Sequence, residues 1–320
     1  MDDVRDALTR KIKVLNEAIW EHRIPEPLIQ AWLDNFRRQG DESVKERLHA
    51  LFLLSNIMYF GSRQMRELLK ALYRDLYRYP VVQSIRKEHD DTLDQTLIGN
   101  FFHDELLKTR FLGVGNPSES GCHLLYYFRQ ENSLPKTQFI HTHEIFHRDT
   151  ETGLVTLRSP DVKRYVFIDD FCGSGNQATK YSRDIVLEVK RLHANVVLAY
   201  YVLFATSDGI QRVRSETAFD EVACIYELDS SFRCFHREAR YFASPPIGID
   251  KSYAEAMSRC YGLTLVPTDP LGYDDCQLLI AFHHNTPDNT LPIIWYDEPD
   301  GEPWTPVFRR YPKYYGWAQP

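Results

Sequence analysis

The stretch from Arg164 to Asn176, RYVFIDDFCGSGN, constrains the fold of this chain more than any other. It opens with an apolar run from Tyr165 to Ile168, which is typical of a buried strand. Two acids and a run of small residues follow, and apolar residues recur at helical spacing after Asn176. The stretch therefore predicts a strand, a tight loop and a helix, which is an order found in α/β folds.

A loop of small residues before a helix directs several backbone N–H groups at one point, and such a point suits a phosphate group. The candidate phosphate-binding residues are Gly173, Ser174, Gly175, Asn176 and Gln177. Carboxylates directly before such a loop can hydrogen-bond sugar hydroxyls or hold a metal ion through water. Asp169 and Asp170 are the candidate catalytic residues, and we expect both to face solvent. A phosphorylated ribose satisfies both requirements.

At these residues the sequence resembles the type I phosphoribosyltransferases, whose signature is an apolar strand, two acids and a small phosphate-binding loop. The resemblance implies a Rossmann-like domain and a substrate such as phosphoribosyl diphosphate (PRPP) or a nucleotide. It also implies Mg²⁺ that is carried by the substrate and reaches Asp169 or Asp170 through water. The sequence departs from the family pattern at Phe171, Cys172, Gly173 and Gln177.

Two other interpretations of the same stretch stay open. Residues 170–175 are similar to the cofactor loop of amino-methylating DNA methyltransferases, which use S-adenosylmethionine, and the Ser-Pro-Pro at 244–246 imitates their second motif. That motif needs an aromatic residue after the prolines to stack on a flipped base, but Ile247 stands there. An ordinary turn between strand and helix is the third interpretation. Cys172 is either a reactive thiol at a helix N-terminus or, as we favour, a small side chain that fills the loop.

The composition is that of a globular protein of 320 residues, enough for one large domain or two smaller ones. The longest apolar run, residues 196–205, is too short to span a membrane, and the N-terminus lacks the apolar core of a signal peptide. The six cysteines form no Cys-x-x-Cys pair, which favours reduced thiols. We therefore expect a cytoplasmic protein with no membrane partner. The net charge of −7 argues against broad nucleic-acid binding but leaves a local basic patch open.

The first hundred or so residues contain only helical apolar patterns, with no candidate catalytic cluster. We therefore predict an all-helical domain over residues 1–108 and a phosphoribosyltransferase-like domain over residues 109–320. The helical domain is expected to serve assembly or regulation, through a protein partner or a second copy of the chain. An apolar face around Leu51, Phe52 and Tyr59 is a candidate docking element. The alternative is that these helices complete the core of the second domain.

A second strand–loop–helix order begins at Phe111, with a turn-rich loop over residues 115–121 and a helix over residues 122–130. This order is again suited to an anion. The resemblance places the pyrophosphate loop here, with Ser118, Ser120, Gly121 and Arg129 as its candidate residues. An ordinary turn is the equally weighted alternative.

Residues 138–146 are predicted to form a further strand, and the polar segment 147–161 stands where the family has a mobile flap. Such a flap would exclude water from a cationic transition state. His141 and His143 would share one face of the strand, with His147 following. A zinc site is a minor alternative, because no cysteine or carboxylate stands at a convincing companion spacing.

Further strands are predicted over residues 195–205 and 222–228, with helices over 177–192 and 208–217. The alternation favours an α/β fold with a mostly parallel sheet that has helices on both faces. Ligands of such sheets bind beyond the carboxyl ends of the strands, where both small-residue loops would lie.

The segment from Leu271 to Trp295 is predicted to contain a strand over 278–282 and a turn over 285–289. Together with the 169–175 stretch it resembles the phosphoribosyltransferase-like family of bacterial conflict and antiphage gene clusters, which include some retrons. The resemblance covers roughly residues 110–300. Four residues here have two interpretations: they contact a base or leaving group, or they simply build the turn. They are His283, His284, Asn285 and Asn289.

The predicted function is attack or exchange at C1′ of a 5′-phosphorylated ribose, in an effector of a bacterial antiphage system. A catalytically silent sensor of nucleotides or PRPP is the main alternative, and a methyltransferase is the weaker one. The aromatic and basic tail after Gly301 leaves contact with nucleic acid open, although a tail packed on the protein surface is favoured.

Overall fold

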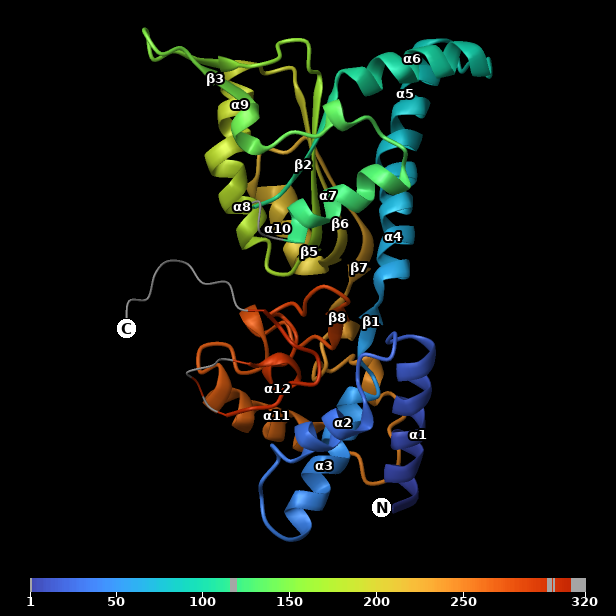
Figure 1. The fold of residues 1–320 in the computed structure, drawn as a ribbon, viewed down its shortest axis with the longest axis vertical. Helices are drawn as coiled ribbons and strands as arrows, with labels where there is room; N and C mark the ends of the chain where they lie inside the picture. Colours follow the sequence, from blue (N-terminus) through green and yellow to red (C-terminus); the bar gives the residue numbers. More distant parts are fainter. Residues whose placement is uncertain (1, 116–119, 298–300, 302, 312–320) are drawn as a thin grey trace. The chain divides into compact units, whose positions relative to one another are not determined.

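A computed structural model describes residues 2–115, 120–297, 301 and 303–311 (Figure 1). The chain divides into two compact units. Unit 1 is formed by residues 1–64 and 229–320, and unit 2 by residues 65–228. The predicted boundary between residues 108 and 109 does not coincide with this division, because it falls inside unit 2.

Unit 2 is built on a parallel sheet, as the alternation of strands and helices predicted. Its strand order is β2-β5-β6-β7, and every neighbouring pair is parallel. Nearly every residue of β5 and β6 is buried, which is typical of strands covered on both faces. The strands are β2 (Thr109–Gly113), β5 (Arg164–Cys172), β6 (Val197–Thr206) and β7 (Glu221–Leu228).

One face of this sheet is covered by the helices that follow β5 and β6. They enclose a core that contains Phe167, Tyr200 and Val213. The helix after β5 is predicted correctly from Asn176 to Leu192, although its middle is π-helical. The elements are α8 (Asn176–Tyr181), η4 (Ser182–Val186), α9 (Leu187–Leu192) and α10 (Ser207–Glu216).

The N-terminal helices of unit 2 pack against the sheet, and this explains why the division differs from the predicted one. Tyr77 lies edge-on to Phe111 of β2, with ring centroids 5.3 Å apart, and its hydroxyl donates to Thr109 Oγ1 at 2.9 Å. Figure 1 shows α4 and α5 in line beside the sheet. The helices are α4 (Ser62–Ala71), η1 (Leu72–Arg78), α5 (Tyr79–Glu88), α6 (Gln95–Leu107) and α7 (Ser120–Glu131).

The predicted strand over residues 138–146 is wrong. The chain instead forms two single 3-10 turns, η2 (Lys136–Gln138) and η3 (Thr142–Glu144), with one bridge between Phe139 and Phe111. The Glu144 carboxylate accepts the His141 N–H at 2.7 Å, and this local bond favours a turn over a strand. The expected flap is a short antiparallel hairpin of β3 (Phe146–Arg148) and β4 (Val155–Leu157).

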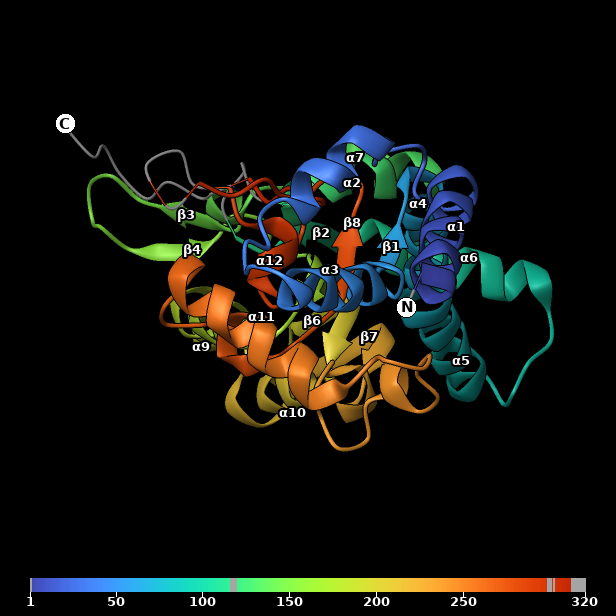
Figure 2. The same cartoon turned by 90° about the horizontal axis from the view of Figure 1, so that it is seen from below.

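Unit 1 joins the two ends of the chain in one core. Trp32 donates its indole N–H to the Ile293 carbonyl oxygen at 2.7 Å, and Trp20 lies edge-on to Phe308. Strands β1 and β8, from opposite ends of the chain, pair in parallel. Figure 2 shows α3 between α1 and α11. The elements are α1 (Asp2–Ala18), α2 (Glu26–Leu33), α3 (Asp41–Leu54), β1 (Met58–Phe60), η5 (Ser230–Phe232), η6 (Arg240–Phe242), α11 (Lys251–Leu265), η7 (Tyr273–Asp275), β8 (Ile280–Phe282) and α12 (Pro292–Trp295).

The proposed docking face of α3 is not exposed. Leu51, Phe52 and Tyr59 are 3%, 4% and 5% exposed, because the C-terminal residues of the chain cover them within the unit 1 core. The prediction of an apolar docking surface at these three residues is therefore wrong. Within the described residues, no helix is long and apolar enough to cross a membrane.

Candidate functional site

The two acids lie at the carboxyl end of β5. Ile168 pairs with Gly113 of β2 on one side and with Tyr201 of β6 on the other, and Asp169 follows directly. Asp169 and Asp170 are only 5% and 7% exposed. The expectation that both face solvent is therefore wrong, because β5 is an inner strand whose last residues are still covered by their neighbours.

Asp169 is held by hydrogen bonds that a carboxyl group facing solvent would not have. Its Oδ2 accepts the Tyr200 hydroxyl at 3.1 Å, and its Oδ1 accepts the Asp170 N–H at 3.0 Å. Burial, and then the neighbouring Asp170 charge, raises the pKa of Asp169 well above its ordinary value. Asp169 therefore favours the protonated form more strongly than an exposed aspartate does.

The loop after the acids has the small-residue geometry that the sequence predicted. Gly175 has a φ of 77°, which favours glycine, and its carbonyl oxygen accepts the first helical N–H from Thr179 at 2.9 Å. The N–H groups of residues 176–178 thus lie in the first turn of the helix, and that of Asn176 donates to Ser174 Oγ at 3.4 Å. The structure brings Gly173, Ser174, Gly175, Asn176 and Gln177 together at the start of α8.

Cys172 fills the space under this loop. Its side chain is buried, and burial, opposed by a hydrogen bond from the Gly175 N–H, raises its pKa to about 12. A raised pKa disfavours the thiolate, which is the reactive form. The finding agrees with the interpretation of Cys172 as a loop-filling side chain.

Sequence reasoning missed the contribution of α10. Thr206 donates its hydroxyl to the Gly173 carbonyl oxygen at 2.6 Å, and Arg212 Nη1 donates to the Ser174 carbonyl oxygen at 2.9 Å. A Cβ atom on Gly209 would stand 2.0 Å from the Gly173 oxygen. The only signal in the sequence is a glycine in the first turn of the helix after β6, which by itself has no specific meaning.

The second predicted loop is only partly described. It starts at the same sheet edge as the acids, since the Val114 N–H donates to the Ile168 carbonyl oxygen at 3.1 Å. Ser118 lies outside the described residues, and Ser120 and Gly121 begin α7. Arg129 is near the far end of α7, over the Tyr126 ring. Eight residues of helix correspond to about 12 Å, so α7 separates Arg129 from Gly121.

A cavity of about 330 Å³ lies beside this sheet edge. The rings of His141 and His143 are nearly parallel there, with centroids 5.7 Å apart, although they stand on a turn and not on the predicted strand. Among the described residues, no group of three or more His, Cys, Asp or Glu side chains is placed to hold a metal ion. The cavity is lined by Gly113, Gly115, Ile140, His141, Thr142, His143, Phe146 and Ile185.

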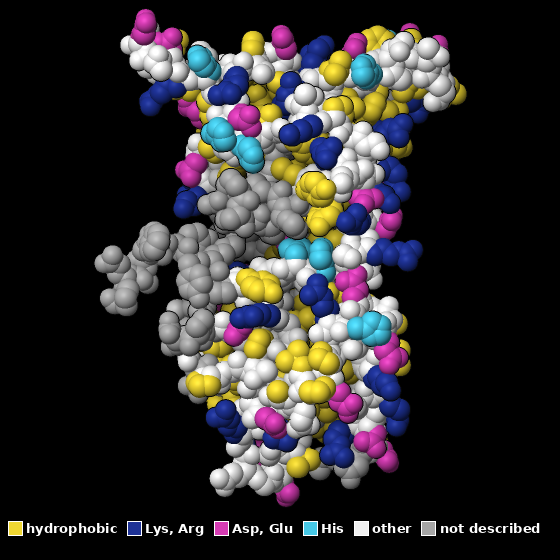
Figure 3. Space-filling view, in the orientation of Figure 1, with side chains coloured by type: hydrophobic (Ala, Val, Ile, Leu, Met, Phe, Trp, Pro, Cys, Tyr) yellow, Lys and Arg dark blue, Asp and Glu magenta, His cyan; other side chains and the backbone are white. Residues whose placement is uncertain are grey.

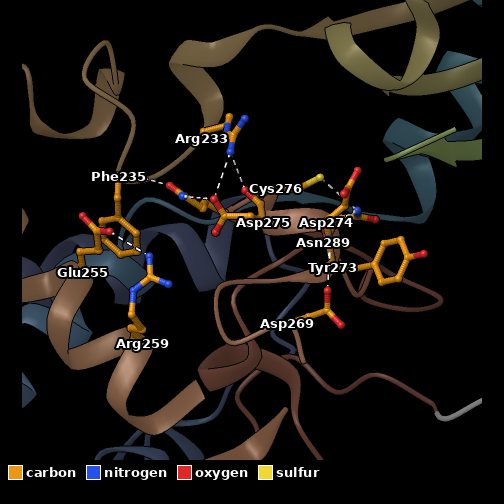
Figure 4. A network of polar contacts seen from close by, with 11 residues as sticks. Arg233, Phe235, Glu255, Arg259, Asp269, Tyr273, Asp274, Asp275, Cys276 and Asn289 are labelled. Atoms are coloured by element: carbon orange, nitrogen blue, oxygen red, sulfur yellow. Dashed lines mark hydrogen bonds and ion pairs between the residues drawn. The ribbon is translucent and has the colours of Figure 1, made fainter. Parts of the chain in front are cut away.

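The candidate residues of the C-terminal segment belong to unit 1, whereas Asp169 and Asp170 belong to unit 2. Asn289 is 4% exposed and donates to the Tyr273 carbonyl oxygen at 3.1 Å, within the polar network of Figure 4. Asn285 accepts the Tyr311 N–H at 3.0 Å, and the backbone N–H of His283 donates to Phe60 at 3.0 Å. Both asparagines thus hold the local backbone, which favours the turn-building interpretation for them.

The charged side chains do not gather into one basic patch on the face shown in Figure 3, where Lys and Arg are interspersed with Asp and Glu. In the described part of the tail, Val307 and Phe308 are buried, and Arg310 pairs with Asp288 at 2.8 Å. Lys313 lies outside the described residues. These contacts agree with a tail that packs on its own unit.

A parallel sheet whose inner strand ends in two acids and a small-residue loop at a helix start defines an α/β protein with a candidate ligand-binding edge. The chain belongs to the PRTase-CE family, whose sequence profile matches residues 29–310. No curated protein matches the chain.

Among solved structures, the chain is similar to orotate phosphoribosyltransferase from Aeropyrum pernix, with 18% identity and a TM-score of 0.24 over 50% of this chain and 76% of that one. It is similar to purine phosphoribosyltransferase from Pyrococcus horikoshii Ot3, with 15% identity and a TM-score of 0.23 over 54% and 85%. A third similar structure is the AQ2163 protein from Aquifex aeolicus, with 13% identity and a TM-score of 0.29 over 64% and 86%.

Proposed function

We propose that this protein acts at C1′ of a 5′-phosphorylated ribose, in PRPP or in a nucleotide. One observation carries the proposal: within nine residues of the chain, two acids and a glycine-rich loop meet at the carboxyl end of an inner parallel strand. That edge is where α/β sheets bind their ligands. Membership of the PRTase-CE family supports the same chemistry.

The 5′-phosphate would bind at the 173–177 loop, through backbone N–H groups other than that of Gly175, which donates to the Cys172 sulfur, and the ribose would lie over the acids. Cleavage at C1′ sends the bonding electrons to the leaving group and leaves positive charge on the sugar. The Asp170 carboxylate would accept a hydrogen bond from a ribose hydroxyl, and Asp169, anchored by Tyr200, would keep the strand end in place. The hairpin of β3 and β4 is the element that would shield the sugar from water.

Mg²⁺ fits this site as an ion carried by the substrate. Both oxygens of Asp169 already accept hydrogen bonds from protein groups, so direct ligation by this residue is disfavoured, and contact through water is the mode that we propose for Asp169 and Asp170. Carboxylate and water oxygens are the ligands that Mg²⁺ prefers. When bound, Mg²⁺ neutralises charge on the departing diphosphate.

The substitution Ser174→Asp tests the loop. A negative charge at a buried loop position (9% exposed) opposes an incoming phosphate, so ribose 5-phosphate affinity should fall at least about tenfold. Ser174→Asn is the matched neutral control and should retain most of the affinity. Isothermal titration calorimetry with ribose 5-phosphate and with unphosphorylated ribose separates phosphate binding from sugar binding. Equal affinity of the Asp and Asn variants for ribose 5-phosphate would contradict the assignment.

Turnover decides between the enzyme and the sensor. Incubation with PRPP or nucleotides and Mg²⁺, followed by phosphorus NMR, should show cleavage at C1′. Binding of the same compounds without any new phosphorus signal would favour a sensor. Saturable binding of S-adenosylmethionine would favour the methyltransferase alternative, whose two motif halves fall in unit 2 and unit 1 respectively.

We further propose a role as an effector in antiphage defence, which rests on the resemblance of residues 271–295 to proteins of bacterial conflict clusters. In that role the protein would be held by a protein partner or by a second copy of itself. Expression of the wild-type protein and of Asp170→Asn with their neighbouring genes, in cells challenged with phage, tests it. Equal plaque counts with the wild-type protein and with Asp170→Asn would contradict the proposed defence role.

A further inference from the structure

Helix α10 fixes the orientation of two successive peptide groups in the 173–177 loop. The Gly173 carbonyl oxygen accepts the Thr206 hydroxyl at 2.6 Å, and the Ser174 carbonyl oxygen accepts Arg212 Nη1 at 2.9 Å. Thr206 is also the N-cap of α10, where its oxygen accepts the Gly209 N–H at 2.9 Å. Both loop carbonyls are therefore turned toward the same helix.

The directions of the N–H groups in these two peptides follow from covalent geometry. The described chain contains no cis peptide bond, and in a trans peptide the N–H points away from the C=O. The Ser174 N–H is thus directed away from Thr206, and the Gly175 N–H away from Arg212 and toward the Cys172 sulfur. Because the Cys172 sulfur takes the Gly175 N–H, the Ser174 N–H is the group of these two peptides that an anion beside the loop would meet.

We infer that Thr206, Gly209 and Arg212 are positioning residues that hold the loop in its anion-binding form. The inference rests on the proposed function for the identity of the anion. A loop with two glycines has many accessible conformations, and a loop fixed in advance binds its ligand without losing that freedom. The three residues act through the loop backbone, which Thr206 and Arg212 hold by hydrogen bonds.

Gly209 contributes by leaving room. A Cβ atom there would lie 2.0 Å from the Gly173 oxygen and 3.0 Å from the Cys172 oxygen, and a Cβ on Gly175 would lie 2.8 Å from the Gly209 oxygen. Loop and helix thus approach each other at two glycines. An alanine at position 209 has to displace loop backbone, because backbone atoms are what it meets.

Arg212 acts by geometry more than by charge. Its Nη1 donates to the Ser174 carbonyl oxygen and, at 3.0 Å, to Asn176 Oδ1, so one planar group spans the loop and the start of α8. Its Nε lies 3.7 Å from Glu216, which offsets part of the positive charge. A lysine keeps the charge but not the fork of donors.

The test compares full-length Thr206→Val, Gly209→Ala, Arg212→Met and Arg212→Lys with the wild type. Each should weaken ribose 5-phosphate binding by roughly tenfold, with little change for unphosphorylated ribose. Thr206→Ser, which keeps the hydroxyl, should restore binding. Arg214→Met is the control on the same helix, because Arg214 bonds to the Val222 carbonyl oxygen and not to the loop. It should bind like the wild type.

Amide hydrogen exchange of residues 173–177 in the ligand-free protein is the second measurement. It should accelerate in Thr206→Val, Gly209→Ala and Arg212→Met and stay unchanged in Arg214→Met. Unchanged exchange, or full rescue of binding by Arg212→Lys, would overturn the inference. If the wild type itself fails to bind ribose 5-phosphate, the proposed function fails, while the exchange data still decide whether α10 holds the loop.

Discussion

The two units solve the same backbone problem in different ways. In unit 2 the left-handed position of the 173–177 loop is taken by a glycine, Gly175. In unit 1, the turn after Gly272 places Asp274, Asp275 and Gln277 at φ values of 56°, 51° and 54°. Such values are unfavourable for residues with a side chain, so this turn needs compensation from its surroundings.

The compensation in unit 1 comes from side-chain hydrogen bonds that join the turn to its surroundings. Asn289 donates to the Tyr273 carbonyl oxygen, Arg233 donates to the Asp275 carbonyl oxygen at 2.9 Å, and Gln277 Oε1 accepts the Phe235 N–H at 3.1 Å. Polar groups of this turn therefore form hydrogen bonds with other residues of unit 1 (Figure 4). In unit 2 the loop carbonyls are satisfied by α10, and the N–H edge of the loop is turned the other way. We therefore expect ligand binding at the first loop and a stabilising role for the second.

Truncation should have the largest effect. A fragment of residues 109–320 loses the helices of unit 2 that precede β2 and also half of the unit 1 core, so we expect no cooperative unfolding transition. A fragment of residues 65–228 retains one complete unit and should unfold cooperatively. Urea titrations followed by circular dichroism check both. A cooperative transition in the 109–320 fragment would show that the helices before residue 109 are dispensable for folding.

The substitution Asp170→Asn should remove activity and leave the fold intact. Loss of the carboxylate charge weakens the hydrogen bond from the ribose hydroxyl and removes a negative charge near the developing cation, so we expect a fall in kcat of about a hundredfold or more. The double substitution with Asp169→Asn should likewise abolish activity while the protein stays folded. Steady-state rates and melting curves of each variant are the measurements. A fully active double variant would remove the acids from the mechanism.

The substitution Asn289→Ala, in unit 1, should lower the stability of the protein and leave ligand affinity intact. It removes one of the donors to the Tyr273 carbonyl oxygen, which also accepts the Cys276 N–H at 3.3 Å, and it loosens a turn with three left-handed residues, so the free energy of unfolding should fall by about 1–3 kcal/mol. Ribose 5-phosphate affinity should stay at the wild-type value. Gly99→Ala is the control, since a Cβ there meets nothing within 4 Å. Lost affinity in a folded Asn289→Ala protein would contradict the division of roles.

The smallest effect concerns pH. Burial raises the pKa of Asp169 in the folded state, so the folded protein binds this proton more tightly than the unfolded chain does. The associated stability is fully present below the unfolded-state pKa, which is about 3.9 for aspartate, and is lost as pH rises through the folded-state pKa. Asp169→Asn does not titrate, so its unfolding free energy should gain on that of the wild type as pH increases. Denaturant titrations at a series of pH values from about 4 upward should show this change in the difference between the two unfolding free energies. A difference that does not change with pH would mean that Asp169 is not held neutral.

The sequence by itself determined the strand β5, the loop after it, the helix from Asn176 and the parallel alternation of unit 2. These are local properties: apolar runs, helical spacing and the tolerance of glycine for a left-handed conformation are all read within a dozen residues. The candidate site residues of the 169–177 stretch lie together because they are neighbours in the chain.

Only the tertiary structure decided what surrounds that stretch. Asp169 is hydrogen-bonded to Tyr200, and the loop carbonyls are hydrogen-bonded to Thr206 and Arg212, all of which stand 30 or more residues away in the chain. The joining of the chain ends in unit 1 places Trp32 against Ile293. No periodicity marks such pairs, because a side chain has the same local pattern whether its partner is solvent or a distant strand. The division into units therefore came from packing, which sums contacts that the local sequence does not contain.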